Sequence, residues 1–222
     1  MIRHFEEELN ELKQRLLAMG RLVEEMINHS IRAVMEQKKD RKQDVIEREE
    51  QVNKSQIEID ESIIAVIARQ QPAAADLRFL TSAMKINSDL ERMGDQAVNI
   101  AQHSLDRAEA VSTEIKELIS RMSEMVKKMV RDSLESFVTR DLRLAQDVLE
   151  RDDEVDSAKD EISAKLTDRM QGDPATIHRS LDLILISRNL ERIGDHATNI
   201  AEDVIYMVAG KDIRHHILEE RR

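Results

Sequence analysis

The chain has 222 residues, of which 41% are hydrophobic and 36% are charged, so it can bury one large core or two smaller ones. Its net charge of −11, without a long basic run, argues against binding to nucleic acid or anionic lipid. The absence of cysteine excludes disulfides, thiolate metal sites and cysteine nucleophiles.

The composition predicts an all-α fold. Aromatic residues make up only 2% of the chain, and there are two prolines and five glycines, so residues that favour strands or break helices are scarce. The first residues, MIRHFEEELN, lack the apolar core of a signal peptide, and nowhere do 18 apolar residues run together. We therefore expect a soluble cytoplasmic protein without membrane insertion.

Three helices are predicted in the first half. The first has an apolar seam with alternating steps of four and three, which is typical of bundle helices. The second is predicted over residues 40–69, and the third begins in the segment QPAAADLRFL, because Pro72 ends one helix and is tolerated in the first turn of the next. The residues expected to face inward are Phe5, Leu9, Leu12, Leu16, Met19, Val23 and Met26, then Val45, Val52, Ile59, Ile63 and Val66, then Ala83, Ile86, Leu90, Met93, Ala97 and Ile100.

The second half repeats this order. Helices are predicted over 113–138 and 141–170, and a sixth begins after the segment QGDPAT, where Pro174 stands as Pro72 did. The stretch LERMGDQAVNIA (90–101) returns as LERIGDHATNIA (190–201) with nine of twelve positions identical, and DVIEREEQVN (44–53) resembles DVLERDDEVD (147–156). We infer six long helices in two similar three-helix bundles that arose by duplication, with repeats at 1–108 and 113–212 and a tail at 213–222.

Each repeat carries oxygen-bearing side chains four residues apart on two helices. Such spacing places two donors side by side on one helix, and two neighbouring helices could then surround a hard or borderline cation. The candidate metal ligands are Glu49, Asn53, Glu91 and Asp95 in the first repeat, and Asp152, Asp156, Glu191 and Asp195 in the second.

A simple solvated surface is the alternative reading of these acids. Against it, Glu91, Arg92, Asp95 and Asn99 recur identically as Glu191, Arg192, Asp195 and Asn199, which drift after duplication should have scrambled. Structural causes can explain part of the identity, because Gly94 and Gly194 would permit close helix contact and the arginines would form ion pairs.

At these residues the sequence resembles the PhoU-type phosphate-signalling regulators of bacteria. The resemblance is carried by EREEQVN with LERMGD, by ERDDEVD with LERIGD, by RQQPAAADLR (69–78) and by GKDIRHH (210–216), and it extends from about Glu7 to His216. It implies two three-helix bundles with multinuclear clusters of divalent or trivalent metal ions, iron or zinc being expected. Asn53 departs from the acid that often stands at its position.

The resemblance also implies a function. Proteins of this kind act as negative regulators between the ATPase subunit of a phosphate ABC transporter and a membrane sensor histidine kinase, coupling phosphate supply to gene expression; a homodimer is a further expectation. The acidic surface of this chain predicts that phosphate is sensed through bound metal or partners rather than by direct binding.

Two alternatives come from other classes of protein. A ferritin-like di-metal oxidase needs Glu-x-x-His pairs that point into the core, and no histidine here has a glutamate three residues before it. A helical scaffold explains the apolar seams but not the repeated polar positions. Other kinds of catalysis are not supported, because the sequence has neither a phosphate-binding GxxxxGK loop nor a nucleophile with an evident base.

The sixth helix begins with SLDLILIS (180–187), which is apolar on several faces and is expected to be buried on several sides.

Overall fold

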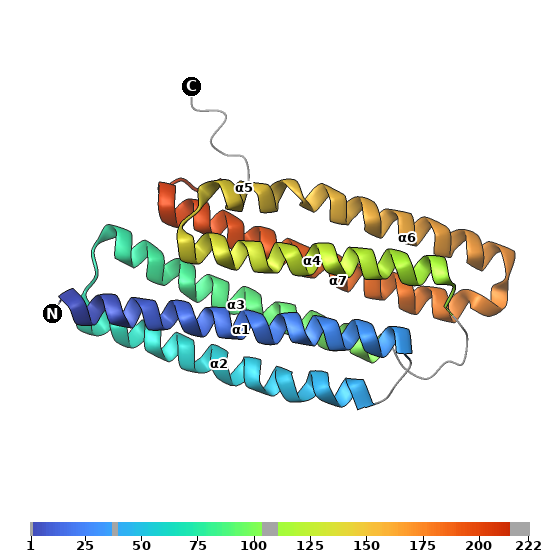
Figure 1. Ribbon diagram of the computed structural model, residues 1–222, viewed down its shortest axis with the longest axis horizontal. Coiled ribbons are helices and arrows are strands. Elements are labelled where there is room, and N and C mark those ends of the chain that lie inside the picture. Colours follow the sequence, from blue (N-terminus) through green and yellow to red (C-terminus); the bar gives the residue numbers. More distant parts are fainter. Residues whose placement is uncertain (1, 37–39, 104–110, 214–222) are drawn as a thin grey trace, which may run out of the picture.

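The computed structural model describes residues 2–36, 40–103 and 111–213. Its first half contains α1 (Ile2–Glu36), α2 (Asp40–Gln70) and α3 (Ala74–His103). Its second half contains α4 (Thr113–Thr139), α5 (Leu142–Glu150), α6 (Asp152–Gly172), the short 3-10 helix η1 (Pro174–Thr176) and α7 (Ile177–Ala209). The two halves form two three-helix bundles packed side by side (Figure 1), so the predicted all-α fold is confirmed. The predicted end of the first repeat at 108, residues 214–222 of the tail, and His215 and His216 lie outside the described residues.

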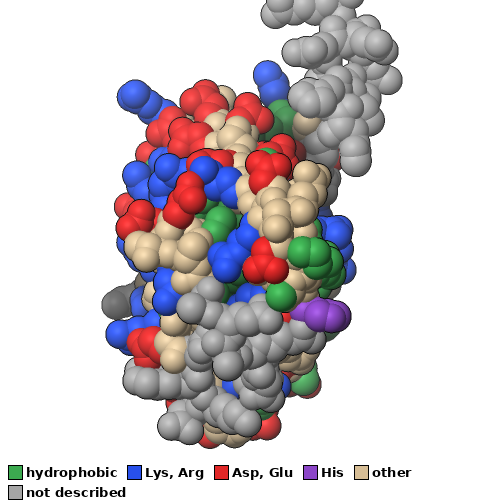
Figure 2. All heavy atoms as spheres, turned by 90° about the vertical axis from the view of Figure 1, so that its right-hand side faces the viewer, with side chains coloured by type: hydrophobic (Ala, Val, Ile, Leu, Met, Phe, Trp, Pro, Cys, Tyr) green, Lys and Arg blue, Asp and Glu red, His purple; other side chains and the backbone are tan. Residues whose placement is uncertain are grey.

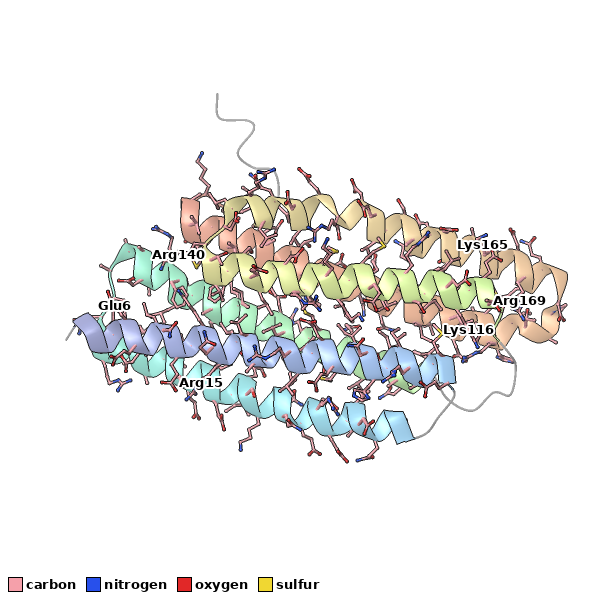
Figure 3. All side chains as sticks on the ribbon, viewed as in Figure 1. Glu6, Arg15, Lys116, Arg140, Lys165 and Arg169 are labelled. Atoms are coloured by element: carbon pink, nitrogen blue, oxygen red, sulfur yellow. The ribbon has the colours of Figure 1, made fainter. Side chains whose placement is uncertain are left out.

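Apolar seams build the core of each bundle. The residues predicted to face inward are buried, apart from the partly buried Phe5 and Leu9 at the start of α1. Charged side chains project outward along the helices (Figure 3), as expected for helices with a single apolar face. Figure 2 shows acidic and basic side chains mixed over one end of the molecule. None of the described helices combines the length and apolar character needed to cross a membrane.

The predicted helix over 141–170 is present but is interrupted at one residue, Arg151, where the chain turns between α5 and α6. The Arg151 guanidinium forms an ion pair with Asp132 of α4, and the backbone N–H of Arg151 donates to the carbonyl of Val148. Three consecutive acids, Asp152 to Glu154, then occupy the first turn of α6, where the helix dipole favours negative charge. The break between α5 and α6 therefore coincides with the ion pair to α4, and no proline or glycine stands at this point of the sequence.

The start of α7 is less buried than expected. Leu183 and Ile186 are buried against the core, but Leu181 and Leu185 on the opposite side are 46% and 37% exposed. The helix is therefore covered on one side only over this segment, and the expectation of burial on several sides is wrong.

The two bundles meet chiefly through α3 and α7, which run antiparallel (Figure 1). At one end the rings of Phe79 and Phe137 stack with centroids 5.2 Å apart, and both side chains are fully buried. Further along, Lys85 Nζ lies 2.9 Å from Asp203 Oδ1 and 5.7 Å from the centroid of the Tyr206 ring. The interface thus combines an apolar end with polar contacts along its length.

A second contact joins α1 to α4. Lys127 Nζ donates to Asn28 Oδ1 at 2.7 Å, and Arg131 pairs with Glu24 at 2.6 Å. Two pairs of helices therefore fix one bundle against the other.

Candidate functional site

The first acidic cluster lies between α2 and α3. Glu49 projects from α2, and Glu91 and Asp95 project one turn apart from α3; all three are partly buried. Burial raises the pKa of Glu49, and the charge of Asp95 adds to this shift. The pKa of Glu91 is raised by burial and then by Asp95, with a smaller contribution from Glu49. The three carboxylates are therefore close enough to repel one another. Asn53, one turn after Glu49, is also partly buried and adds a neutral amide.

The second acidic cluster lies between α6 and α7. Asp152, Asp156 and Glu191 are partly buried, and Asp195 reaches the surface. Burial raises the pKa of Asp152 to about 6, with the charges of Asp195 and Asp156 adding to the shift. Partial desolvation of the Asp195 carboxylate, together with the charge of Glu191, raises the pKa of Asp195. The structure thus brings the four predicted acids of the second repeat into one group.

A lysine that sequence reasoning overlooked lies within the second cluster. Lys159 Nζ is 3.1 Å from Asp156 Oδ1 and 3.4 Å from Glu191 Oε1, and its side chain is 22% exposed. The hydrogen bond to Asp156 raises the pKa of Lys159, so the ammonium group stays charged. The equivalent residue in the first repeat is the neutral Gln56. The sequence could have indicated this lysine, because the two repeats differ by Lys159 in place of Gln56, seven residues after Asp152 and Glu49 respectively.

The donor set suits a hard cation, but the side chains do not enclose one. Within 2–36, 40–103 and 111–213, no three acidic or histidine side chains converge on a point that could hold a metal ion. The shifted pKa values nevertheless show that each repeat holds carboxylates in mutual repulsion, which a cation would relieve. A metal ion would be held by Glu49, Glu91 and Asp95 in the first repeat, and by Asp152, Asp156, Glu191 and Asp195 in the second, after a change of rotamers.

Gly94 and Gly194 stand where each acid-bearing helix meets its neighbours. A Cβ atom added at Gly94 would lie 3.5 Å from Met26 Cε and Val52 Cγ1, and one at Gly194 would lie 3.5 Å from Val155 Cγ1. These are ordinary contact distances, so a methyl group at either position would already touch the neighbouring helices. Close packing accounts for the small residue at both positions, as the sequence suggested. The expected close ion pairs of Arg92 and Arg192 are not formed within the described residues, but the charge of Arg92 lowers the pKa of the adjacent Glu91 against the effect of burial.

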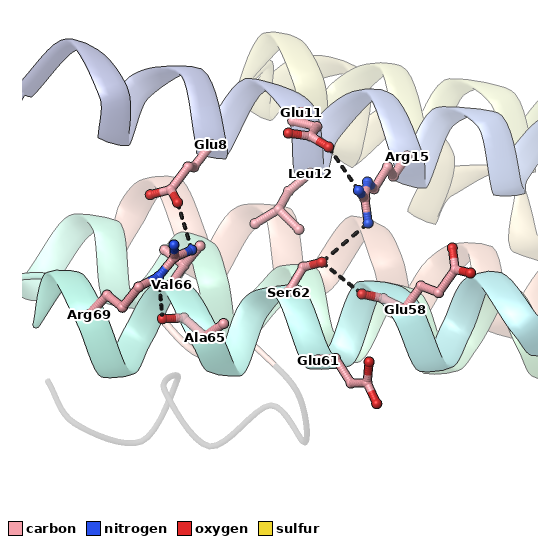
Figure 4. Close-up of a pocket in the computed structure, with 10 residues that line it drawn as sticks. All are labelled: Glu8, Glu11, Leu12, Arg15, Glu58, Glu61, Ser62, Ala65, Val66 and Arg69. Carbon is pink, nitrogen blue, oxygen red and sulfur yellow. Dashed lines mark hydrogen bonds and ion pairs between the residues drawn. The ribbon is translucent and has the colours of Figure 1, made fainter.

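The groove between α1 and α2 offers no catalytic arrangement. Its volume is about 430 Å³, and Figure 4 shows its side chains engaged with one another. Arg69 binds Glu8 at 2.7 Å, and Arg15 binds both Glu11 at 2.8 Å and Ser62 at 3.2 Å. Ser62 bears the one hydroxyl group of the groove and donates it to the backbone carbonyl of Glu58 rather than to a base, so the groove holds no activated nucleophile.

Asp152→Asn is expected to stabilise the metal-free protein by about 1 kcal/mol near pH 7.5 and to change nothing near pH 4. Because the pKa of Asp152 in the folded protein, about 6, lies above the 3.8 of an unperturbed aspartate, this group costs stability as pH rises through that window. The full shift corresponds to about 3 kcal/mol, which solvent screening reduces at this partly exposed site. Urea denaturation in EDTA across this range measures the effect. Asp168→Asn, an exposed acid on the same helix, is the control, and equal pH profiles for the two variants would contradict the prediction.

Comparison with known proteins gives the same picture along the whole chain. The PhoU domain family matches residues 16–104 and 119–204, one segment in each bundle. A phosphate-specific transport system accessory protein PhoU homolog from Pseudomonas putida is 41% identical over 212 residues, covering 95% of this chain and 83% of the relative. A homolog with the same description from Aquifex aeolicus is 38% identical and covers 96% of this chain and 97% of the relative.

Solved structures agree with the fold. The crystal structure of PhoU from Pseudomonas aeruginosa superposes with a TM-score of 0.88 at 39% identity, covering 93% of this chain and 100% of that one. The phosphate transport system regulatory protein PhoU from Streptococcus pneumoniae gives a TM-score of 0.86 at 27% identity, covering 94% and 99%. With both repeats, their order and their packing matched, the chain belongs to the PhoU family.

Proposed function

We propose that this protein is a non-enzymatic cytoplasmic regulator of phosphate uptake and of phosphate-responsive gene expression. The observation that carries the proposal is the pair of acidic clusters, repeated on equivalent helices and unaccompanied by any catalytic arrangement within the described residues. Relatives with the same repeats bear the name of transport system accessory proteins. A role in regulating transport therefore fits both the site and the family.

The proposed mechanism is negative regulation through protein contacts. The partners are the ATPase subunit of a phosphate ABC transporter and a membrane sensor histidine kinase, with a second copy of the chain as a further partner. Iron or zinc bound between α2 and α3, and between α6 and α7, would neutralise the two acidic clusters and so change the charge of the surface offered to these partners. Residues of this chain supply the ligands and fix their spacing along rigid helices.

Deletion of the gene in its host is expected to raise expression of phosphate-acquisition genes when phosphate is plentiful, because the negative regulator is lost. A transcriptional reporter for a phosphate transporter gene measures the effect, and the wild-type gene supplied in trans should restore repression. The Asp195→Asn variant should restore it less well than the control Asp168→Asn, an exposed acid outside both clusters. An unaltered phosphate response in the deletion strain would contradict the regulatory role and favour a structural scaffold.

A further inference from the structure

The antiparallel packing of α3 and α7 brings equivalent positions of the two repeats together at one point. In the pairs Asp89 with His196 and His103 with Asp182, the two residue numbers add up to 285. Equivalent residues of these two helices differ by 100 in number, as Leu90 and Leu190 do. A residue and its equivalent in the other repeat therefore lie side by side only where their numbers differ by 100 and also add up to about 285, which is near 92 and 192. Both of these positions are arginines.

Arg92 and Arg192 line a single hollow of about 400 Å³ between the two bundles. Both residues are exposed, and neither guanidinium has a hydrogen bond or an ion pair within the described residues, although the charge of Arg92 acts on the neighbouring Glu91 carboxylate. Two unpaired guanidinium groups in one hollow repel each other, and an anion between them would relieve that repulsion. Their planar forks are suited to binding an oxyanion through two hydrogen bonds each. The other residues that line the hollow are Gln96, Asp195, His196 and Asn199.

Two acids of the adjoining hollow are engaged by other side chains. In the adjoining hollow, Asp89 Oδ1 lies 2.9 Å from His196 Nδ1 and accepts a hydrogen bond from Asn199 Nδ2 at 3.4 Å. Asp203, in the same hollow, binds Lys85 at 2.9 Å. Of the charged side chains that line the hollow shared by both arginines, the two guanidinium groups outnumber the one carboxylate, that of Asp195.

The hollow also contains acceptors that need a donor. Gln96 Oε1 is buried without a hydrogen-bond partner in the described part of the chain, and the Asp195 carboxylate lines the same space. An ion that carries both negative oxygens and a proton can bind the arginines and donate its proton to one of these acceptors. Hydrogen phosphate has such a proton near neutral pH, whereas sulfate has none.

We propose that the hollow between α3 and α7 binds hydrogen phosphate, held between Arg92 and Arg192. Each repeat supplies one arginine, so neither bundle forms the site alone. This site departs from the expectation of indirect sensing, which rested on the charge of the whole chain. It deepens the proposed function by giving the regulator a ligand of its own, and the binding measurement is made on purified protein, so its result is independent of the deletion phenotype.

Isothermal titration of the full chain with inorganic phosphate, in EDTA and at low ionic strength, tests the proposal. We expect one phosphate per chain, and we expect Arg92→Gln and Arg192→Gln each to weaken binding by about tenfold or more, because each removes a charged pair of donors. EDTA removes phosphate held by metal ions from the measurement. Arg143→Gln is the matched control, because Arg143 is an exposed arginine on α5 and should bind phosphate like the wild type.

Sulfate titrated under the same conditions should bind at least about tenfold more weakly, because it cannot donate to Gln96 or Asp195. Thermal unfolding confirms that each variant is folded. Absence of phosphate binding, equal binding by the wild type and both arginine variants, or equal binding of sulfate and phosphate would each overturn the proposal.

Discussion

Phe79→Ala is expected to lower the free energy of unfolding by about 3–5 kcal/mol, because it removes a fully buried aromatic ring and leaves a cavity between the bundles. Phe79 stacks on Phe137, so part of the loss belongs to the pair rather than to either ring. Urea denaturation followed by circular dichroism measures the change. Phe137→Ala should cost a similar amount, and the double variant should cost less than the sum by about 0.5–1.5 kcal/mol.

The chain provides its own control for this experiment. Phe5, the remaining phenylalanine of the chain, is only partly buried near the start of α1, so Phe5→Ala should cost clearly less than either core variant. Equal losses at all three positions, or full additivity of the two core substitutions, would show that the stack does not join the bundles.

Asp156→Asn is expected to weaken metal binding in the second cluster by about 10–100-fold, and Lys159→Gln to strengthen it. Asp156 is one of four carboxylates there, against three in the first cluster, and each carboxylate both binds and neutralises a cation. Because it has one more carboxylate than the first, the second cluster is expected to retain metal more firmly during dialysis. Lys159 offsets one of the four negative charges, so both clusters have a net charge of −3. The second cluster therefore binds metal more tightly than the first only if the metal ion displaces the lysine.

Metal content of the wild type and the two variants, measured by elemental analysis after stepwise dialysis, decides between these effects. Anomalous scattering from partly stripped crystals would locate the retained ions. Preferential retention beside Asn53 in wild-type protein, with no gain in Lys159→Gln, would show that neither carboxylate number nor the lysine controls affinity. The metal-free protein should remain folded, because the acids lie off the apolar seams.

The sequence predicts those parts of the fold that depend on periodicity. Apolar seams, the two prolines and the repeated segments are local patterns, and they locate the helices, the duplication and the acids that gather in the second cluster. The break at Arg151 was missed because the partner of its guanidinium, Asp132, belongs to another helix. Three acids in succession after Arg151 are the local signal that could have indicated a new helix start.

Contacts between helices explain the remaining differences. Lys159 enters the second cluster only because α6 packs beside α7, and the two arginines share a hollow only because α3 and α7 are antiparallel. Leu181 and Leu185 are exposed because only the side of α7 that carries Leu183 and Ile186 is covered over this segment, and a helical wheel drawn for one segment cannot show which side that is. Such features depend on which faces dock, and the apolar pattern of a single helix leaves this choice open.

The contact between Lys85 and Tyr206 gives the protein a built-in optical reporter. The chain has no tryptophan and a single tyrosine, so light at wavelengths that phenylalanine does not absorb excites only the ring beneath the Lys85 ammonium group, between the two bundles. Emission from unlabelled protein therefore follows one known point of the interface. A sliding of α3 along α7 when a ligand or partner binds would alter the surroundings of that ring, and the motion could be timed in a stopped-flow instrument without introducing a dye or a mutation.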